Sequence, residues 1–137
     1  MLEKDLVLQN VSKRYGDKLV VDGVDLTINK GDFLTILGPS GGGKTTVLKM
    51  ISGFESISSG DIFLDGKTIG SIPAHKRNFG MLFQNYALFP HMTVAENVAY
   101  PLKIRHTPKD RQKEMVHDIL KTVGLEEYEK RYPRQLR

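Results

Sequence analysis

The clearest chemical signal in the chain is a glycine-rich segment that runs Gly38-Pro39-Ser40-Gly41-Gly42-Gly43-Lys44-Thr45. It matches the pattern G-x-x-x-x-G-K-[ST], in which the lysine reaches the β- and γ-phosphates and the hydroxyl is placed to bind Mg²⁺. Consecutive glycines let the backbone turn its N–H groups inward around an anion, because no Cβ atom blocks positive φ. The segment is therefore predicted to bind the phosphates of a nucleoside triphosphate.

The residues on either side predict the strand–loop–helix setting that phosphate binding requires. Residues 33–37 (FLTIL) form a short apolar, partly β-branched run that predicts a buried strand. Residues 45–51 are typical of a helix, and Gly53 follows as its terminal glycine. The aligned peptide dipoles of such a helix add about half a positive charge at its start. A flexible glycine–serine linker with a chance lysine is the alternative, and this setting disfavours it.

The remaining pattern predicts an α/β layered protein whose N-terminal part is an antiparallel sheet. Residues 6–11 and 19–28 predict two strands that lead toward the glycine-rich loop. Residues 60–69 predict a hairpin that turns at Asp65-Gly66. An apolar triplet followed by aspartate can also imitate the strand-end carboxylate that holds Mg²⁺ in NTPases. The Asp-Gly pair, however, favours the turn.

Two polar side chains leave alternatives open at this stage. Gln84 ends the predicted strand 79–83, at a position where α/β proteins bind ligands. Its amide could contact an attacking water or Mg²⁺, or it could be an ordinary hydrogen-bonded loop residue. Tyr15, in the turn after the first strand, could cover the sheet edge or stack on a nucleotide base. Periodicity does not choose between these alternatives.

An unusually apolar loop, residues 85–92, precedes a helix that the capping box of Thr93 and Glu96 predicts. The loop either packs on its own domain or contacts a partner protein, and packing is the default. Further along the chain, Thr107 is predicted to cap another helix, which Gly124 should end.

Composition limits the class of protein. The chain has 137 residues, enough for one modest domain, and its 39% hydrophobic and 26% charged content is that of a soluble globular protein. The absence of cysteine excludes disulfides and thiolate chemistry. The net charge of +4 arises largely within residues 103–137, whose mixed signs favour a solvated helix face over a nucleic-acid surface. Without a membrane-length apolar run or a signal peptide, a cytosolic location is expected.

Taken in order, these motifs resemble the N-terminal part of the ATP-binding subunit of an ABC transporter, and the resemblance covers essentially the whole chain. It rests on residues 11–16 (VSKRYG), 37–46 (LGPSGGGKTT) and, most specifically, 83–97 (FQNYALFPHMTV-x-EN). The third segment resembles bacterial importers of polyamines, ferric iron, sulfate and sugars, with polyamine import as the first choice. The resemblance implies an α/β P-loop NTPase core of the ABC ATPase type with an N-terminal antiparallel β part.

The resemblance also implies a role for each matching residue. Tyr15 would stack on adenine, the glycine-rich segment would be Walker A, and Gln84 would be the Q-loop glutamine. Lys44 and Gln84 are then the implied catalytic residues, and Thr45 and Gln84 the implied Mg²⁺ contacts, with ATP and Mg²⁺ as cofactors. The implied nucleotide-binding residues are Tyr15, Gly38, Pro39, Ser40, Gly41, Gly42, Gly43, Lys44, Thr45 and Thr46.

The same resemblance implies partners and a location. A second ATP-binding domain, expected to be an identical copy, would complete each ATP site. Membrane permease subunits would dock near Tyr86 to Met92, and a solute-binding protein would join through the complex; no nucleic acid is expected. The assembly would lie at the cytoplasmic face of a bacterial inner membrane, held there by the permease, while the isolated chain would be soluble.

The family pattern continues beyond Leu136 into a signature motif, whereas this chain ends at Arg137. The signature motif, the Walker B strand and the switch histidine have no counterpart in the sequence. Residues 1–137 are therefore expected to be a partial nucleotide-binding domain, incomplete at its C-terminus, of a transport ATPase that energises solute import. Alone, the chain is expected not to hydrolyse ATP. A non-hydrolysing nucleotide-binding fragment and another P-loop enzyme are the alternatives, and Tyr15 disfavours the second.

Overall fold

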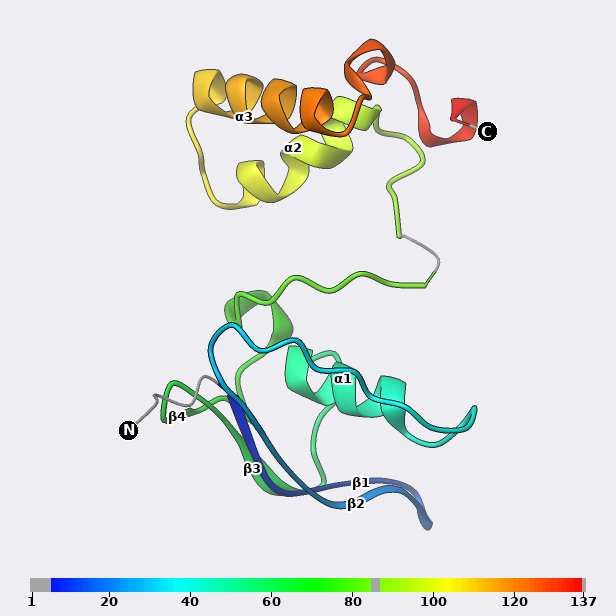
Figure 1. Cartoon of the computed structure of the whole chain (residues 1–137), viewed down its shortest axis with the longest axis vertical. Coiled ribbons are helices and arrows are strands. Elements are labelled where there is room, and N and C mark those ends of the chain that lie inside the picture. Colours follow the sequence, from blue (N-terminus) through cyan, green and yellow to red (C-terminus); the bar gives the residue numbers. More distant parts are fainter. Residues whose placement is uncertain (1–5, 85–86, 137) are drawn as a thin grey trace. The chain divides into compact units, whose positions relative to one another are not determined.

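The computed structural model describes residues 6–84 and 87–136, which fall into two units, Met1–Met81 and Leu82–Arg137 (Figure 1). The first unit combines a sheet with one helix, and the second contains helices, so the predicted α/β class is confirmed. No helix within the described ranges is both long enough and apolar enough to cross a membrane.

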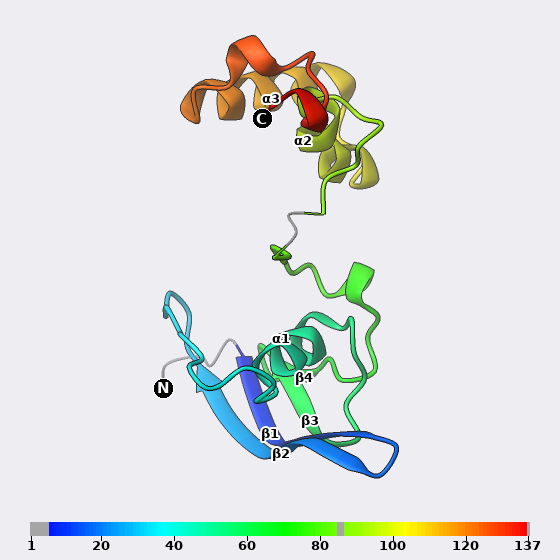
Figure 2. The same ribbon diagram turned by 90° about the vertical axis from the view of Figure 1, so that its right-hand side faces the viewer.

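A four-stranded antiparallel sheet forms the base of the first unit, with the strand order β2-β1-β3-β4. The strands are β1 (Leu6–Tyr15), β2 (Lys18–Ile28), β3 (Ser59–Leu64) and β4 (Lys67–Thr68). This sheet confirms the predicted N-terminal antiparallel part. Figure 2 shows helix α1 (Lys44–Ser52) lying over one face of the sheet.

The core of this unit lies between the sheet and α1. Its most completely buried side chains come from β1, β3 and the helix, and include Leu8, Val11, Met50 and Ile62, each no more than 1% exposed. Side chains alternate along β1, and an irregularity between Leu8 and Val11 shifts the register so that both residues face the core. Packing against this core orients α1.

The turn predicted at Asp65-Gly66 is confirmed. Leu64 pairs with Lys67, so Asp65 and Gly66 form a tight two-residue connection between β3 and β4. Both have positive φ, 48° for Asp65 and 76° for Gly66, which is the signature of a type I′ turn. Asp65 thus serves the turn, as the sequence favoured.

The C-terminal end of α1 is held by a buried arginine. Helix α1 stops at Gly53, whose φ of 81° confirms the predicted terminal glycine. Arg77 Nη1 donates to the carbonyl oxygens of Met50 (2.7 Å) and Ile51 (2.9 Å), so a positive charge lies at the negative end of the helix. Burial lowers the pKa of this guanidinium, which nonetheless stays charged. Arg77 therefore links the segment after β4 to α1.

Two predicted strands are wrong. Residues 33–37 and 79–83 are irregular, and several of their apolar side chains are exposed: Phe33 is 95%, Leu37 86% and Leu82 82% exposed. A strand exists only where neighbours accept its backbone hydrogen bonds, and the sheet formed by the described residues pairs with neither segment. The apolar run at 33–37 is thus left exposed, because none of the described strands pairs with it.

The second unit contains α2 (Val94–Ile104) and α3 (Lys109–Thr122), followed by short 3-10 helices at Glu126–Tyr128 and Pro133–Gln135. The helices bury Val94, Val116 and Leu120 between them. The predicted capping box at the start of α2 is confirmed. Thr93 N–H donates to Glu96 Oε2 (2.8 Å), and Glu96 N–H donates to Thr93 Oγ1 (3.2 Å).

The predicted N-cap at Thr107 is wrong by one residue. Pro108 occupies the cap position with an extended ψ of 142°, and α3 begins at Lys109 without a side-chain cap. The Thr107 carbonyl instead accepts a hydrogen bond from the Gln112 side chain at 2.7 Å. Gly124 follows the helix with a φ of 68°, as predicted.

We expect Arg77→Met to lower the free energy of unfolding by roughly 2–3 kcal/mol. Methionine fills much of the same volume but leaves the carbonyls of Met50, Ile51, Ile72 and Gly70 without their charged donor. Urea unfolding followed by far-ultraviolet circular dichroism measures the change. Arg14→Met is the control, because the side chain of the exposed Arg14 donates to the Asp17 carbonyl of the β1–β2 turn (3.3 Å) and lies away from the end of α1. Equal losses in the two variants would contradict the capping role.

The capping box predicts a pH dependence of stability. The hydrogen bond that the Thr93 N–H donates to the Glu96 carboxylate holds the pKa of that carboxyl below its ordinary value of 4.5. Because the folded-state pKa is lowered, the stabilisation is complete above pH 4.5 and is lost as the pH falls through the folded value. In Glu96→Gln the free energy of unfolding should therefore fall less steeply as the pH is lowered. Urea titrations between neutral pH and about pH 3 measure this acid limb of the pH dependence. Glu127→Gln, at an exposed carboxylate outside the capping box, should leave that limb as in the original chain.

Candidate functional site

The glycine-rich loop enters α1 through a backbone conformation that only glycine adopts readily. Gly41 and Gly43 have φ values of 78° and 80°. A Cβ atom on Gly43 would lie 2.9 Å from the Val20 carbonyl oxygen and 3.2 Å from a Val21 methyl group. Gly43 is therefore required both by its φ and by its close approach to β2. This contact fixes where the helix begins.

The start of α1 offers hydrogen-bond donors to an anion. The cap residue, Gly43, has no side chain that could accept from the first-turn N–H groups, and the first turn contains no acidic residue. The N–H groups of Lys44, Thr45 and Thr46 have no acceptor within the helix, as in the first turn of any α-helix. Together with the helix dipole, these donors fit a phosphate group.

Lys44 adds a full charge beside these donors. Its Nζ atom donates to the carbonyl oxygens of Gly38 (2.8 Å) and Pro39 (2.5 Å), so the ammonium lies folded over the loop. These contacts are solvent-exposed, and an anion at the loop can compete for the same ammonium. The ammonium therefore lies at the glycine-rich loop, and its predicted role toward phosphates stays a prediction.

The donor set also fits Mg²⁺ coordination through a hydroxyl and phosphate oxygens. Thr45 is exposed in the first turn of α1, beside the phosphate donors. Within the described part of the chain, no cluster of three or more His, Cys, Asp or Glu side chains could hold a metal ion unaided. A cation here would therefore depend on Thr45, water and phosphate oxygens, which is how Mg²⁺ is commonly held.

Tyr15 ends β1 and lies close to the helix that carries the loop. Its hydroxyl donates to Glu55 Oε2 at 2.8 Å, and the ring is 46% exposed. This bond to a carboxylate raises the pKa of Tyr15, and burial adds to the rise, while the neighbouring Thr46 hydroxyl lowers it. The Lys13 ammonium and the Tyr15 hydroxyl together lower the pKa of Glu55. The structure thus brings Tyr15 and Thr46, both predicted nucleotide contacts, into one neighbourhood.

Gln84 belongs to the second unit, where it is exposed in a turn instead of ending a strand. Its predicted roles toward Mg²⁺ and an attacking water stay predictions. The strand that was expected to present it does not form, because residues 79–83 find no pairing partner among the described strands.

The apolar loop after Gln84 packs on its own unit through Phe89, while most of its other described residues are exposed. Tyr86 lies outside the described residues. Phe89 stacks at a tilt on Tyr100, with ring centroids 4.6 Å apart, and its N–H donates to Asn97 Oδ1 at 2.9 Å. Leu88, in contrast, is 52% exposed. The default interpretation of packing is confirmed for Phe89, while docking of a permease at this loop stays a prediction.

Sequence reasoning missed two residues of the site, Lys13 and Glu55. The first signal was available, because Lys13 follows the buried Val11 at the two-residue period of a strand. A lysine at an inward position calls for a partner. Its partner, Glu55, comes after α1 and is distant in sequence, so local patterns could not identify it.

Comparison with known proteins bears on the family of the chain. A model of the ABC transporter family matches residues 21–136. The spermidine/putrescine import ATP-binding protein of Pasteurella multocida is 50% identical over 129 residues, covering 94% of this chain and 35% of that protein. The protein of the same name from Thermotoga maritima is 46% identical over 136 residues, covering 99% of this chain and 37% of the relative. An Fe(3+) ions import ATP-binding protein of Fusobacterium nucleatum is 45% identical over 132 residues, covering 96% and 36% respectively.

The chain spans about a third of the length of these relatives. Among solved structures, the chain resembles a dimeric post-hydrolysis state of the ATP-binding cassette MJ0796 bound to ADP and Pi. The TM-score is 0.82 at 27% identity, with 96% of this chain and 63% of the other covered. A protein with the same fold thus holds a nucleotide and phosphate.

The loop geometry predicts unequal effects of two glycine substitutions. Gly43→Ala should destabilise the chain more than Gly41→Ala, by roughly 1–2 kcal/mol. Both positions have φ near 80°, but a Cβ on Gly43 meets the Val20 carbonyl, while a Cβ on Gly41 meets open space. Chemical unfolding of both variants measures the difference, and Gly41→Ala serves as the control for backbone strain alone. Equal destabilisation would show that the close approach to β2 is unimportant.

Proposed function

The chain belongs to the ABC transporter family, and on that premise we propose that it is the nucleotide-contacting part of an ATP-binding subunit that energises solute import. The observation that carries the proposal is the start of α1, where uncapped N–H groups and the Lys44 ammonium converge on one side of the glycine-rich loop. A ligand with several adjacent negative charges suits this arrangement. ATP is such a ligand.

We assign the phosphates to the loop and to Lys44. In the structure the ammonium is shared between two backbone carbonyls of the loop, Gly38 and Pro39. Transfer of the ammonium to a β- or γ-phosphate oxygen exchanges neutral acceptors for charged ones, which make shorter and stronger hydrogen bonds. Mg²⁺, when bound through Thr45, would neutralise charge on the same phosphate oxygens.

We assign the adenine base to Tyr15, whose exposed ring stands near Thr46 in the first turn of α1. An aromatic face that stacks on a base supplies affinity without a specific hydrogen-bond pattern. Gln84 is proposed to position the attacking water and to contact Mg²⁺. Hydrolysis of ATP is proposed for the whole subunits of the family, and this chain spans about a third of the length of the relatives it matches.

The proposed partners follow from the relatives. A second identical copy is supported by the dimeric state named for the structural neighbour. Permease subunits, contacting the loop at residues 87–92, and a solute-binding protein complete the proposed importer at the cytoplasmic face of the bacterial inner membrane. Polyamines are the proposed cargo, since the relatives named for spermidine and putrescine reach 50% identity against 45% for the ferric iron relative.

The proposal predicts that Lys44→Ala weakens binding of a fluorescent ATP analogue by at least about tenfold, which corresponds to roughly 1.4 kcal/mol. The reason is the loss of the one side-chain charge that the loop directs toward the phosphates. Fluorescence anisotropy with the 137-residue chain measures the dissociation constant. Lys49→Ala, a basic residue near the other end of α1, is the matched control and should bind as the original chain does. Unchanged binding in Lys44→Ala would remove the central claim.

A further inference from the structure

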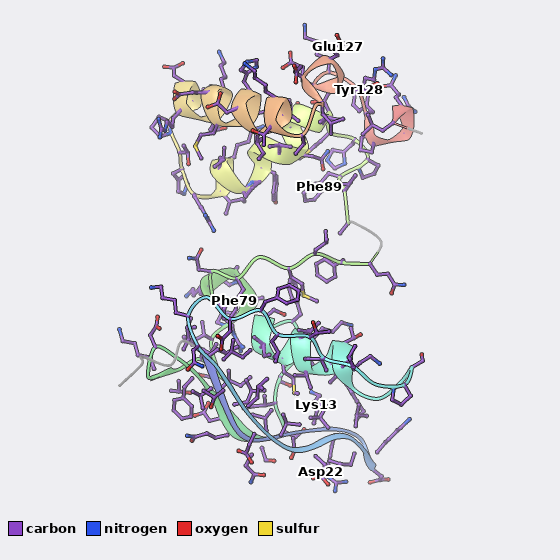
Figure 3. All side chains as sticks on the ribbon, in the orientation of Figure 1. Lys13, Asp22, Phe79, Phe89, Glu127 and Tyr128 are labelled. Atoms are coloured by element: carbon purple, nitrogen blue, oxygen red, sulfur yellow. The ribbon has the colours of Figure 1, made fainter. Side chains whose placement is uncertain are left out.

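A charged cluster beneath Tyr15 is not used by any of the phosphate contacts. It consists of Lys13 on β1, Glu55 and Ser56 after α1, and the Tyr15 hydroxyl. Lys13 reaches from the strand to the segment that follows the helix (Figure 3). The cluster therefore joins the end of β1 to the end of α1.

Lys13 is buried to an extent that is unusual for a lysine. It is 6% exposed, and its Nζ atom contacts Glu55 Oε1 at 2.7 Å, the Ser56 carbonyl at 2.7 Å and Ser56 Oγ at 3.1 Å. All three donor positions of the ammonium are thus engaged. Removing a charge from water is unfavourable, and an apolar side chain at this inward position of β1 would serve the core as well. A buried lysine here indicates a purpose beyond packing.

The cluster holds the Tyr15 ring at two points. Glu55 Oε2 accepts from the ring hydroxyl at 2.8 Å, and Lys13 Nζ lies over the ring, 5.0 Å from its centroid. The same carboxylate that pairs with Lys13 therefore anchors the tip of the ring, while the cation covers one face. Tyr15 as a whole is still 46% exposed, so the residue remains accessible to a ligand.

We infer that Lys13 and Glu55 are positioning residues that hold the Tyr15 ring ready to stack on a flat base, a purine in the case of ATP. The inference rests on the proposed function, because it concerns the base of the nucleotide whose phosphates bind the glycine-rich loop. A ring that is already immobile loses no rotational freedom when the base arrives, so its stacking contributes fully to affinity. Lys13 and Glu55 act through Tyr15 without touching the nucleotide.

The test compares ATP with inorganic tripolyphosphate, which presents the phosphates without a base. Glu55→Ala should weaken ATP binding about three- to tenfold and leave tripolyphosphate binding within about twofold of the original chain. Tyr15→Ala removes the ring and should weaken ATP binding about tenfold or more, and this loss measures the whole contribution of the base contact. Asp17→Ala, an exposed carboxylate two residues beyond Tyr15, is the matched control and should change neither affinity. Isothermal titration with the 137-residue chain gives both constants.

A spectroscopic readout distinguishes positioning from a merely structural role. The Glu55 carboxylate raises the pKa of Tyr15 because it accepts a hydrogen bond from the protonated Tyr15 hydroxyl. Removing the carboxylate should therefore lower that pKa toward the ordinary tyrosine value. Absorbance titration of tyrosinate measures the shift. Subtraction of the Tyr15→Phe titration isolates the signal of this tyrosine.

The outcomes separate the two proposals. If the original chain binds neither ATP nor tripolyphosphate, the proposed function fails, and the inference fails with it. Suppose that the original chain binds ATP and that Tyr15→Ala loses this binding. If Glu55→Ala then keeps the original ratio of ATP affinity to tripolyphosphate affinity, the inference alone is overturned. Parallel loss of both affinities in Glu55→Ala would assign the residue to the fold and also overturn the inference. Should that variant not fold, Glu55→Gln, which keeps the length but not the charge paired with Lys13, is judged by the same ratio.

Discussion

Gly43 passes so close to β2 that a Cβ atom there would lie 2.9 Å from the Val20 carbonyl oxygen, and this approach determines where α1 begins. The helix can start at this point only because the loop ahead of it turns through positive φ, which glycine adopts without strain. With the start of the helix fixed against the sheet, its first-turn N–H groups face a single region of space. The proposed phosphate site of the first unit depends on that contact.

The opposite end of α1 is held by two buried cations. Arg77 donates to the carbonyls of Met50 and Ile51 in the last turn, and Lys13 binds Glu55 and Ser56 immediately beyond it. Burying two positive charges is unfavourable in itself, and each is compensated by several acceptors, four carbonyl oxygens for Arg77 and three oxygen atoms for Lys13. The effect is that a nine-residue helix, too short to be stable alone, keeps one orientation over the sheet. A helix whose dipole is aimed at a ligand needs that fixed orientation.

Features whose causes lie within a few residues could be predicted from the sequence. The glycine-rich loop, the Asp65-Gly66 turn and the capping box of Thr93 each depend on contiguous residues, and each is found. The strands at 33–37 and 79–83 could not be predicted in this way, because a strand is defined by a pairing partner that the local pattern does not contain. The base-contacting part of the site was hidden for a related reason. Tyr15 was identified by resemblance alone, and its supports come from elements distant in sequence.

The two sides of the glycine-rich loop are consequently held to different degrees. On the helix side, Gly43 packs on β2 and α1 is tied at both ends. On the other side, residues 33–37 lie in irregular backbone with Phe33 and Leu37 largely exposed, and Ile36 packs on the core. The Lys44 ammonium, bonded to Gly38 and Pro39, draws that side toward the helix. The proposed recognition of phosphate would therefore depend first on the donors of α1, which are already oriented. Because Lys44 both closes the loop and supplies its charge, a bound phosphate would compete directly with the contact that holds the loop closed.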